Sequence, residues 1–146
     1  MSFTTVTWFV DTNLLVYARD ASEAEKQPLA AEWLRFLWRS GDGRLSMQVL
    51  QEYYNVVTRR LNPGLDREQA MADVRDLMLW DPVPVDGGIL ERAWSLEQRF
   101  RLSWWDALIL GAAGHIGSRF LLSEDLQDGL EIDGMTVLNP FKHSAP

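Results

Sequence analysis

The sequence predicts an α/β fold, a three-layer α/β/α sandwich with a central, mostly parallel sheet. Short runs of β-branched and aromatic residues alternate with longer segments of helical periodicity. Strands that are separated by helices are joined by parallel crossovers, which place helices against the faces of the sheet. The chain has 146 residues and no linker-like stretch, so we expect a single domain over residues 1–146.

The first half of the chain is expected to hold one strand and four helices. The strand covers Thr5–Val10, because this run is β-branched and aromatic and ends at Asp11. A helix over Asn13–Arg19 follows at once. The remaining helices show apolar residues at helical spacing, and the last also has the residue spacing of a capping box. They are expected around Leu29–Leu37, from Ser46 to Leu61, and from Asp66 to about Leu79.

The second half is expected to hold two further helices and three strands. Val83–Val85 predicts a short strand near the sheet edge, because prolines interrupt it. Asp86 begins a helix that continues to Phe100, and Ser103 begins a very apolar helix that is broken at Gly117. The last two strands are predicted over Arg119–Ser123 and Met135–Leu138.

The composition excludes several classes of protein. The chain has no cysteine, which excludes a disulfide framework, a thiolate zinc site and cysteine catalysis. No stretch approaches 18 apolar residues and no signal peptide is recognisable, so we expect a cytoplasmic protein without membrane contact. The net charge of −7 argues against indiscriminate nucleic-acid binding. All but two of the 14 cations are arginine, however, and arginine binds phosphate well.

Four acidic residues lie in apolar surroundings: Asp11, Glu52, Asp106 and Asp125. A partly buried carboxylate is unfavourable unless it is paired, hydrogen-bonded or bound to a metal. None of the four has a matching Lys or Arg neighbour in the sequence, so the set predicts a site for Mg²⁺ or Mn²⁺. Asp11 and Asp125 also follow predicted strands, where parallel sheets bind their ligands.

Each acid also has a purely structural interpretation. Asp11 can cap a helix, and Asp106 stands three residues after Ser103 in capping-box spacing. Glu52 can occupy a surface position and Asp125 a turn. We favour a common site because four separate structural roles would have to coincide.

Several short motifs occur in the order found in a known family. They are Val10-Asp11-Thr12-Asn13, Ser46 with Gln51-Glu52, Trp105-Asp106-Ala107-Leu108-Ile109, Leu122-Ser123-Glu124-Asp125 and Asn139-Pro140-Phe141. This ordered set, which spans nearly the whole chain, resembles the PIN domain and, more narrowly, the VapC-type ribonuclease toxins.

The resemblance implies an acidic metal site formed by Asp11, Glu52, Asp106 and Asp125, with Mg²⁺ or Mn²⁺ as cofactor. Asn13, Ser46 and Ser123 match accessory polar positions of the family. Within the last motif, Glu124, Asp125 and Asp128 are all candidates for the fourth acid. Asp125 is preferred because it stands two residues after Ser123.

The resemblance further implies a metal-dependent endoribonuclease that acts as the toxin of a toxin–antitoxin pair. A metal-activated water would hydrolyse RNA phosphodiester bonds and leave 5′-phosphate and 3′-hydroxyl ends. The implied partners are a cognate antitoxin and an RNA substrate, and we expect a homodimer, the commonest soluble oligomer. The alternative is a non-catalytic PIN-like module that binds other proteins.

We expect mainly structural roles for the two histidines and the seven tryptophans of the chain. Neither His115, near a helix end, nor His143, in the C-terminal tail, is expected to catalyse. Core packing is expected for Trp8, Trp33, Trp94 and Trp105, whereas Trp38, Trp80 and Trp104 are less constrained, and one of these three could stack on an RNA base.

Overall fold

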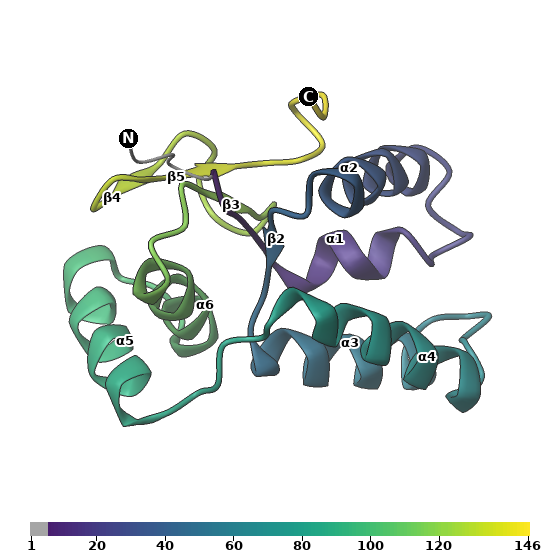
Figure 1. Ribbon diagram of the computed structural model, residues 1–146, viewed down its shortest axis with the longest axis horizontal. Coiled ribbons are helices and arrows are strands. Elements are labelled where there is room, and N and C mark those ends of the chain that lie inside the picture. Colours follow the sequence, from purple (N-terminus) through teal and green to yellow (C-terminus); the bar gives the residue numbers. More distant parts are fainter. Residues whose placement is uncertain (1–5) are drawn as a thin grey trace.

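The computed structural model describes residues 6–146, which form a five-stranded sheet flanked by helices (Figure 1). Its spatial order is β2-β1-β3-β5-β4. The first four strands in this order are parallel, and β4 pairs antiparallel with β5. This arrangement confirms the α/β prediction. The strands are β1 (Trp8–Val10), β2 (Gly43–Arg44), β3 (Phe120–Leu122), β4 (Glu131–Ile132) and β5 (Met135–Leu138).

The order of the strands reverses between β1 and β3. After β1 the chain adds β2 on one side, and much later it returns to add β3 on the other side. Val10 lies opposite Leu122, so these two neighbouring parallel strands end at the same level. In open α/β sheets, the crevice beyond such a pair of carboxyl ends is where ligands bind.

Most helices begin where the sequence predicts a helix cap. The side chains of Ser46, Asp66, Asp86 and Ser103 each accept a hydrogen bond from a backbone N–H of the first helical turn. No helix within residues 6–146 is both long and apolar enough to span a membrane. The helices are α1 (Thr12–Tyr17), α2 (Lys26–Ser40), α3 (Met47–Arg59), α4 (Arg67–Leu77), the 3₁₀-helix η1 (Met78–Trp80), α5 (Gly87–Phe100) and α6 (Trp104–His115).

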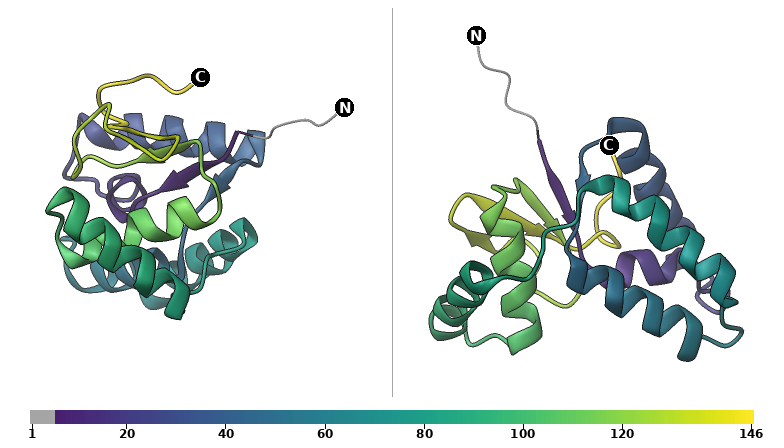
Figure 2. Two further views of the ribbon diagram at one scale, coloured as in Figure 1. Left: turned by 90° about the vertical axis from the view of Figure 1, so that its left-hand side faces the viewer. Right: turned by 60° about the horizontal axis from the view of Figure 1, so that its bottom comes forward.

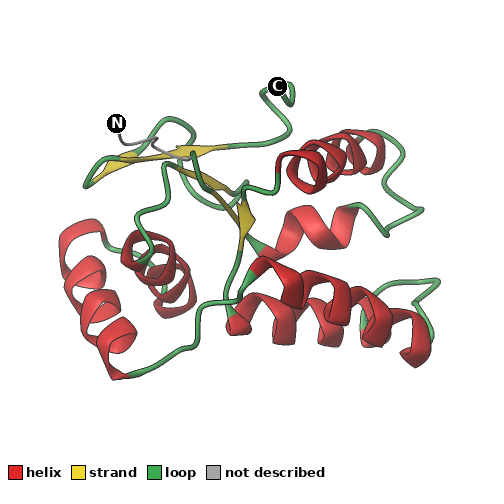
Figure 3. Cartoon of the chain, viewed as in Figure 1, coloured by secondary structure: helices red, strands yellow, loops and turns green. Residues whose placement is uncertain are grey.

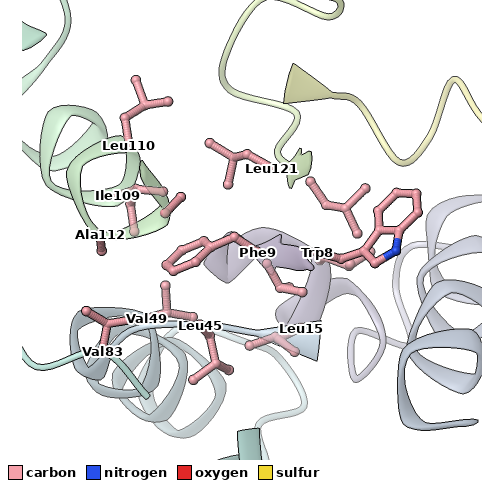
Figure 4. Close-up of a cluster of buried hydrophobic side chains, with 14 of the residues drawn as sticks. Trp8, Phe9, Leu15, Leu45, Val49, Val83, Ile109, Leu110, Ala112 and Leu121 are labelled. Atoms are coloured by element: carbon pink, nitrogen blue, oxygen red, sulfur yellow. The ribbon is translucent and has the colours of Figure 1, made fainter. Parts of the chain in front are cut away.

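Successive side chains of β1 point to opposite faces of the sheet and tie both helical layers to it. Trp8 packs on Trp33 and Phe36 of α2, with ring centroids 5.4 and 5.6 Å away. Phe9 points to the other face, toward Val49 of α3 and Ile109 of α6 (Figure 4). The pair α5 and α6 covers the part of the sheet near β3 and β5, while α3 and α4 lie beside α1 (Figure 2).

The prediction of a strand over Val83–Val85 is wrong. Only Val83 forms a bridge, which is parallel and lies opposite Ser46, just after β2: its N–H donates to the Leu45 carbonyl at 3.0 Å, and its own carbonyl accepts from the Met47 N–H at 2.9 Å. The rest of the segment between η1 and α5 is loop (Figure 3), because the prolines on either side of Val83 have no N–H to donate.

Other element boundaries also differ from the predictions. The sequence pattern does not predict β2 and β4, because a strand of two residues is too short to show a periodic pattern. The first strand begins at Trp8, and Thr5 lies outside the described residues. Helix α3 ends at Arg59 rather than at Leu61.

Two tryptophans expected in the core are exposed, whereas Trp80, for which the sequence predicts no fixed position, is buried. Trp94 and Trp105 are 48% and 62% exposed, and Trp94 stacks on Trp104 with ring centroids 6.2 Å apart. Trp80 is buried over Gly43, where an added Cβ would lie 3.1 Å from the indole ring. Helical spacing cannot distinguish a core stripe from an apolar contact between two helices at the surface.

Candidate active site

Four acidic side chains from four segments line one open cleft at the carboxyl ends of the central strands. Asp11 follows β1 and caps α1, and Asp125 follows β3. Glu52 comes from the middle of α3, and Asp106 from the first turn of α6. With Asn13 of α1 they line a cleft of about 620 Å³. The structure thus brings together the four acids that the sequence singled out.

Asp11 is the buried member of this group. One of its carboxylate oxygens accepts a hydrogen bond from the Thr12 N–H at 2.7 Å, and the other accepts from the Ser123 hydroxyl at 2.8 Å. Burial raises the pKa of Asp11 to about 6, even though both hydrogen bonds favour the charged form. The negative charges of Asp125 and Glu52 also raise this pKa.

Glu52 is oriented by two donors that the sequence reasoning missed. The Thr12 hydroxyl donates to one carboxylate oxygen at 2.7 Å, and the Gln48 amide donates to the other at 3.0 Å. Gln48 precedes Glu52 by one helical turn, so the i, i+4 spacing was an available signal. Nothing in the sequence indicated that Thr12 would reach α3.

Asp125 is held by a side-chain amide and by a hydroxyl shared with Asp11. The Asn13 amide donates to its carboxylate at 2.8 Å, and its backbone N–H donates to the Ser123 hydroxyl at 3.2 Å. Burial and then the charge of Asp106 raise the pKa of Asp125 above its usual value. Ser123 therefore lies behind two of the acids and links them.

Glu124 and Asp128, the other candidates for the fourth acid, have partners outside the cleft. Glu124 accepts a hydrogen bond from the Tyr17 hydroxyl at 2.7 Å and pairs with the Lys26 ammonium at 2.9 Å. Asp128 accepts from the backbone N–H of Asn139 at 2.8 Å. Neither lines the cleft, whereas the acid that lies between them in the sequence does.

Ser46 and the two histidines do not line the cleft. Ser46 is fully buried and caps α3 by accepting a hydrogen bond from the Val49 N–H at 3.3 Å. His143 lies 3.0 Å from the Asp128 carboxylate, and His115 is the last residue of α6. Ser46 thus contributes to the cleft only by fixing the start of the helix that carries an acid.

Trp105 and Arg60 are cleft residues that the sequence reasoning did not identify as such. The Trp105 side chain, expected in the core, lines the cleft next to Asp106. Arg60 follows α3 directly and is the one cation among the described cleft residues. These two side chains give the cleft an aromatic surface and a guanidinium beside its carboxylates.

The donor chemistry of the cleft fits a hard divalent cation. Among the residues that the structure describes, none of the four acids forms an ion pair. Carboxylate oxygens are preferred ligands of Mg²⁺ and Mn²⁺, and a cation relieves the repulsion between them. No three acidic or histidine side chains within residues 6–146 are grouped closely enough to hold an ion as they stand. A bound ion would therefore draw the carboxylates closer together.

One family model and several solved structures are similar to this chain. The PIN domain model matches residues 8–127. A toxin–antitoxin complex from Klebsiella pneumoniae is similar with a TM-score of 0.63 and 23% identity, over 92% of this chain and 98% of that one. The Mycobacterium tuberculosis toxin VapC20, which cleaves the sarcin–ricin loop, is similar with a TM-score of 0.58 and 21% identity, over 79% of this chain and 87% of that one.

A third solved structure shares the fold at lower identity. VapBC2 from Rickettsia felis, bound to a DNA fragment from its promoter, has a TM-score of 0.59 and 15% identity, over 90% of this chain and 97% of that one. At these identities the likeness shows a common fold. No curated protein matches the chain.

The raised pKa of Asp11 predicts how stability depends on pH. The folded protein keeps the Asp11 proton up to about pH 6, whereas the unfolded chain loses it near 3.8. The contribution of Asp11 to the free energy of unfolding is therefore fully present below pH 3.8, the pKa in the unfolded chain. It is lost as the pH rises through about 6, the pKa in the folded protein. Asn resembles the protonated acid and does not titrate. The free energy of unfolding of Asp11→Asn, relative to that of wild type, should therefore rise by up to about 3 kcal/mol from pH 4 to pH 7.5. Urea unfolding of both proteins in EDTA measures this difference, and a difference that is the same at both pH values would contradict it.

Proposed function

This chain belongs to the PIN domain family, and we propose that it is a metal-dependent endoribonuclease that acts as the toxin of a toxin–antitoxin pair. The observation that carries the proposal is the cleft in which four carboxylates converge without an ion-pair partner among the described residues. We further propose that residues 1–146 form one catalytic domain. The likeness to VapC20, a toxin that cleaves the sarcin–ricin loop, supports RNA as the substrate.

In the proposed mechanism Asp11, Asp106 and Asp125 hold Mg²⁺ or Mn²⁺. The ion, when bound, supplies a water of lowered pKa and offsets charge on the phosphate oxygens. Glu52 orients the attacking water or holds a second ion, and its own orientation is set by Thr12.

The accessory polar residues keep the acids in position for this reaction. Asn13 holds the Asp125 carboxylate, and Ser123 donates to Asp11, so neither acid can turn away from the cleft without losing a hydrogen bond. Ser46 acts indirectly, because it caps the helix that carries Glu52.

RNA cleavage by the purified chain tests the proposed activity. Wild type should cleave labelled single-stranded RNA in Mg²⁺ or Mn²⁺ and lose this activity in EDTA. Asp11→Asn should lower the rate at least about a hundredfold, because a metal ligand is lost. Asp66→Asn, which changes an exposed helix cap outside the cleft, is the matched control and should cleave normally. Equal cleavage by wild type and Asp11→Asn would point to a contaminating nuclease and leave the non-catalytic binding module as the interpretation.

Metal binding can also be measured without a substrate. A ligand that binds only the folded state stabilises it, by about 1.4 kcal/mol at ten times its Kd, which corresponds to a Tm increase of roughly 3–5 °C. Millimolar Mn²⁺ should produce such an increase in wild type and in Asp66→Asn. The double variant Asp11→Asn/Asp106→Asn should show little change, and an equal rise in all three proteins would place the ion elsewhere.

The proposed partner is a basic antitoxin, encoded beside this chain, that blocks the cleft. The structures of similar fold include a toxin–antitoxin complex and VapBC2, which supports this kind of partner. A guanidinium forms bidentate hydrogen bonds with carboxylates and keeps its charge, so an antitoxin Arg directed at Asp11 and Asp106 would oppose metal binding.

An apolar groove offers a place for the rest of such an inhibitor. It has a volume of about 540 Å³ and is lined by residues of α1, α2 and α4, among them Leu15, Leu34 and Leu77. Trp38 and Leu79 lie at this groove and are 42% and 78% exposed. An extended antitoxin segment with apolar side chains would cover them, and a toxin homodimer would present two such grooves.

Co-expression with the neighbouring reading frame tests this partner. We expect a complex that co-purifies and has suppressed nuclease activity, with an association rate that falls as salt rises, because the partners carry opposite charge. Replacing the antitoxin's cleft-directed Arg by Ala should restore cleavage while the complex persists. Full inhibition by that variant would contradict blockage of the carboxylates.

A further inference from the structure

A third pocket, besides the acidic cleft and the apolar groove, lies at the amino ends of β3 and β5, opposite the end of the sheet that carries the acidic cleft. Its volume is about 230 Å³, below the range of roughly 300–1,000 Å³ usual for drug-sized ligands, so it suits a small chemical group. We call it the arginine pocket. Its polar side chains are Arg92, Ser95 and Arg99 of α5, Ser118 and Arg119 before β3, and Asp133 in the turn between β4 and β5.

The arginine pocket carries an excess of positive charge in a chain whose net charge is −7. Arg99 forms two hydrogen bonds to the Asp133 carboxylate, at 3.0 and 3.2 Å. The charges of this guanidinium and this carboxylate therefore offset each other. Arg92 and Arg119 have no carboxylate partner among the described residues. Arg119 donates to the Thr136 hydroxyl at 3.2 Å, which orients the guanidinium without neutralising it. Three guanidinium groups and the one carboxylate of Asp133, whose pKa the charges of both Arg99 and Arg92 lower, thus leave the pocket with an excess of two positive charges.

A buried hydroxyl in the same pocket also lacks a partner. Ser118 is 4% exposed, and its oxygen has no hydrogen-bond partner within residues 6–146. Leaving a buried polar group unpaired is unfavourable, so a ligand oxygen at this place would satisfy it. The pocket therefore has an unused donor as well as an unused charge.

Small residues keep the arginine pocket open at the end of α6. Gly114 leaves space in which an added Cβ would lie 3.9 Å from an Arg92 guanidinium nitrogen. Two carbonyls in the last turn of α6 accept hydrogen bonds from the residues that follow: Ala113 from the Ser118 N–H at 3.0 Å, and Gly114 from the Gly117 N–H at 3.1 Å.

We propose that the arginine pocket binds a phosphate monoester dianion. Arg92 and Arg119 balance its two charges through bidentate hydrogen bonds, and the Ser118 hydroxyl donates to a third oxygen. A phosphate monoester is mostly doubly charged at pH 7.5, because its second pKa is about 6. A carboxylate would balance only one of the two guanidinium groups. The site is separate from the acidic cleft and requires no nuclease activity.

Titration of ¹⁵N-labelled protein with inorganic phosphate in EDTA, at constant ionic strength, tests this site. Saturable shifts should appear at the amides of Gly114, Gly117 and Ser118, and sodium chloride should not reproduce them. Arg92→Gln should weaken binding by about tenfold or more, because a charged hydrogen-bond donor is lost. Arg39→Gln, at an exposed position of α2, is the matched control and should bind as wild type does.

Ser118→Ala separates ligand binding from folding. Loss of an unpaired hydroxyl should leave the free protein at least as stable as wild type, whereas phosphate should raise the Tm of wild type more than that of the variant. Shifts that do not saturate, equal weakening by Arg92→Gln and Arg39→Gln, or tighter binding of acetate than of phosphate would each overturn the proposal.

The source of the phosphate group follows from two further titrations. A mononucleotide with a 5′-phosphate and a short RNA with a 5′-phosphate are compared with the same RNA ending in a 5′-hydroxyl. Tighter binding of the phosphorylated RNA than of inorganic phosphate, lost in Arg92→Gln, assigns the pocket to an RNA end. Binding no tighter than that of inorganic phosphate assigns it to the free ion.

Discussion

The parallel pairing of β1 with β3 is the interaction on which the candidate active site depends. Because Val10 lies opposite Leu122, the chain leaves both strands at the same level. The Asp11 N–H then donates to the Leu122 carbonyl at 3.1 Å, and Ser123 is placed to donate to the Asp11 side chain. A slip of one residue would turn Asp11 to the other face of the sheet and separate it from Asp125.

The burial that fixes Asp11 also makes its negative charge unfavourable. The hydrogen bonds from Thr12, Asn13 and Gln48 orient the surrounding carboxylates, yet none of these donors carries a positive charge. Arg60 is the single cation among the described residues that line the cleft. An added cation is therefore the natural complement of the cleft, and a metal ion and a partner's guanidinium would compete for the same oxygens.

Charge is distributed unequally along the strands. Helix α6 runs from the acidic cleft, where Asp106 lies in its first turn, to the arginine pocket, where Gly114 lies in its last. The carboxyl ends of the strands thus carry carboxylates without ion-pair partners among the described residues, and the amino ends carry an excess of guanidinium groups. A net charge of −7 would not have indicated this separation, because it averages over both ends of the sheet.

The sequence by itself determined the fold class, the starts of most helices and the cleft acids Asp11, Glu52 and Asp106, because strand and helix periods, helix caps and strand-end acids are local patterns. Only the tertiary structure decided which acid after β3 faces the cleft, since Tyr17 and Lys26, distant in sequence, hold Glu124 elsewhere. It likewise exposed Trp105 and buried Trp80, and it joined Thr12 to α3. These outcomes depend on contacts between segments far apart in the chain, which no local pattern records.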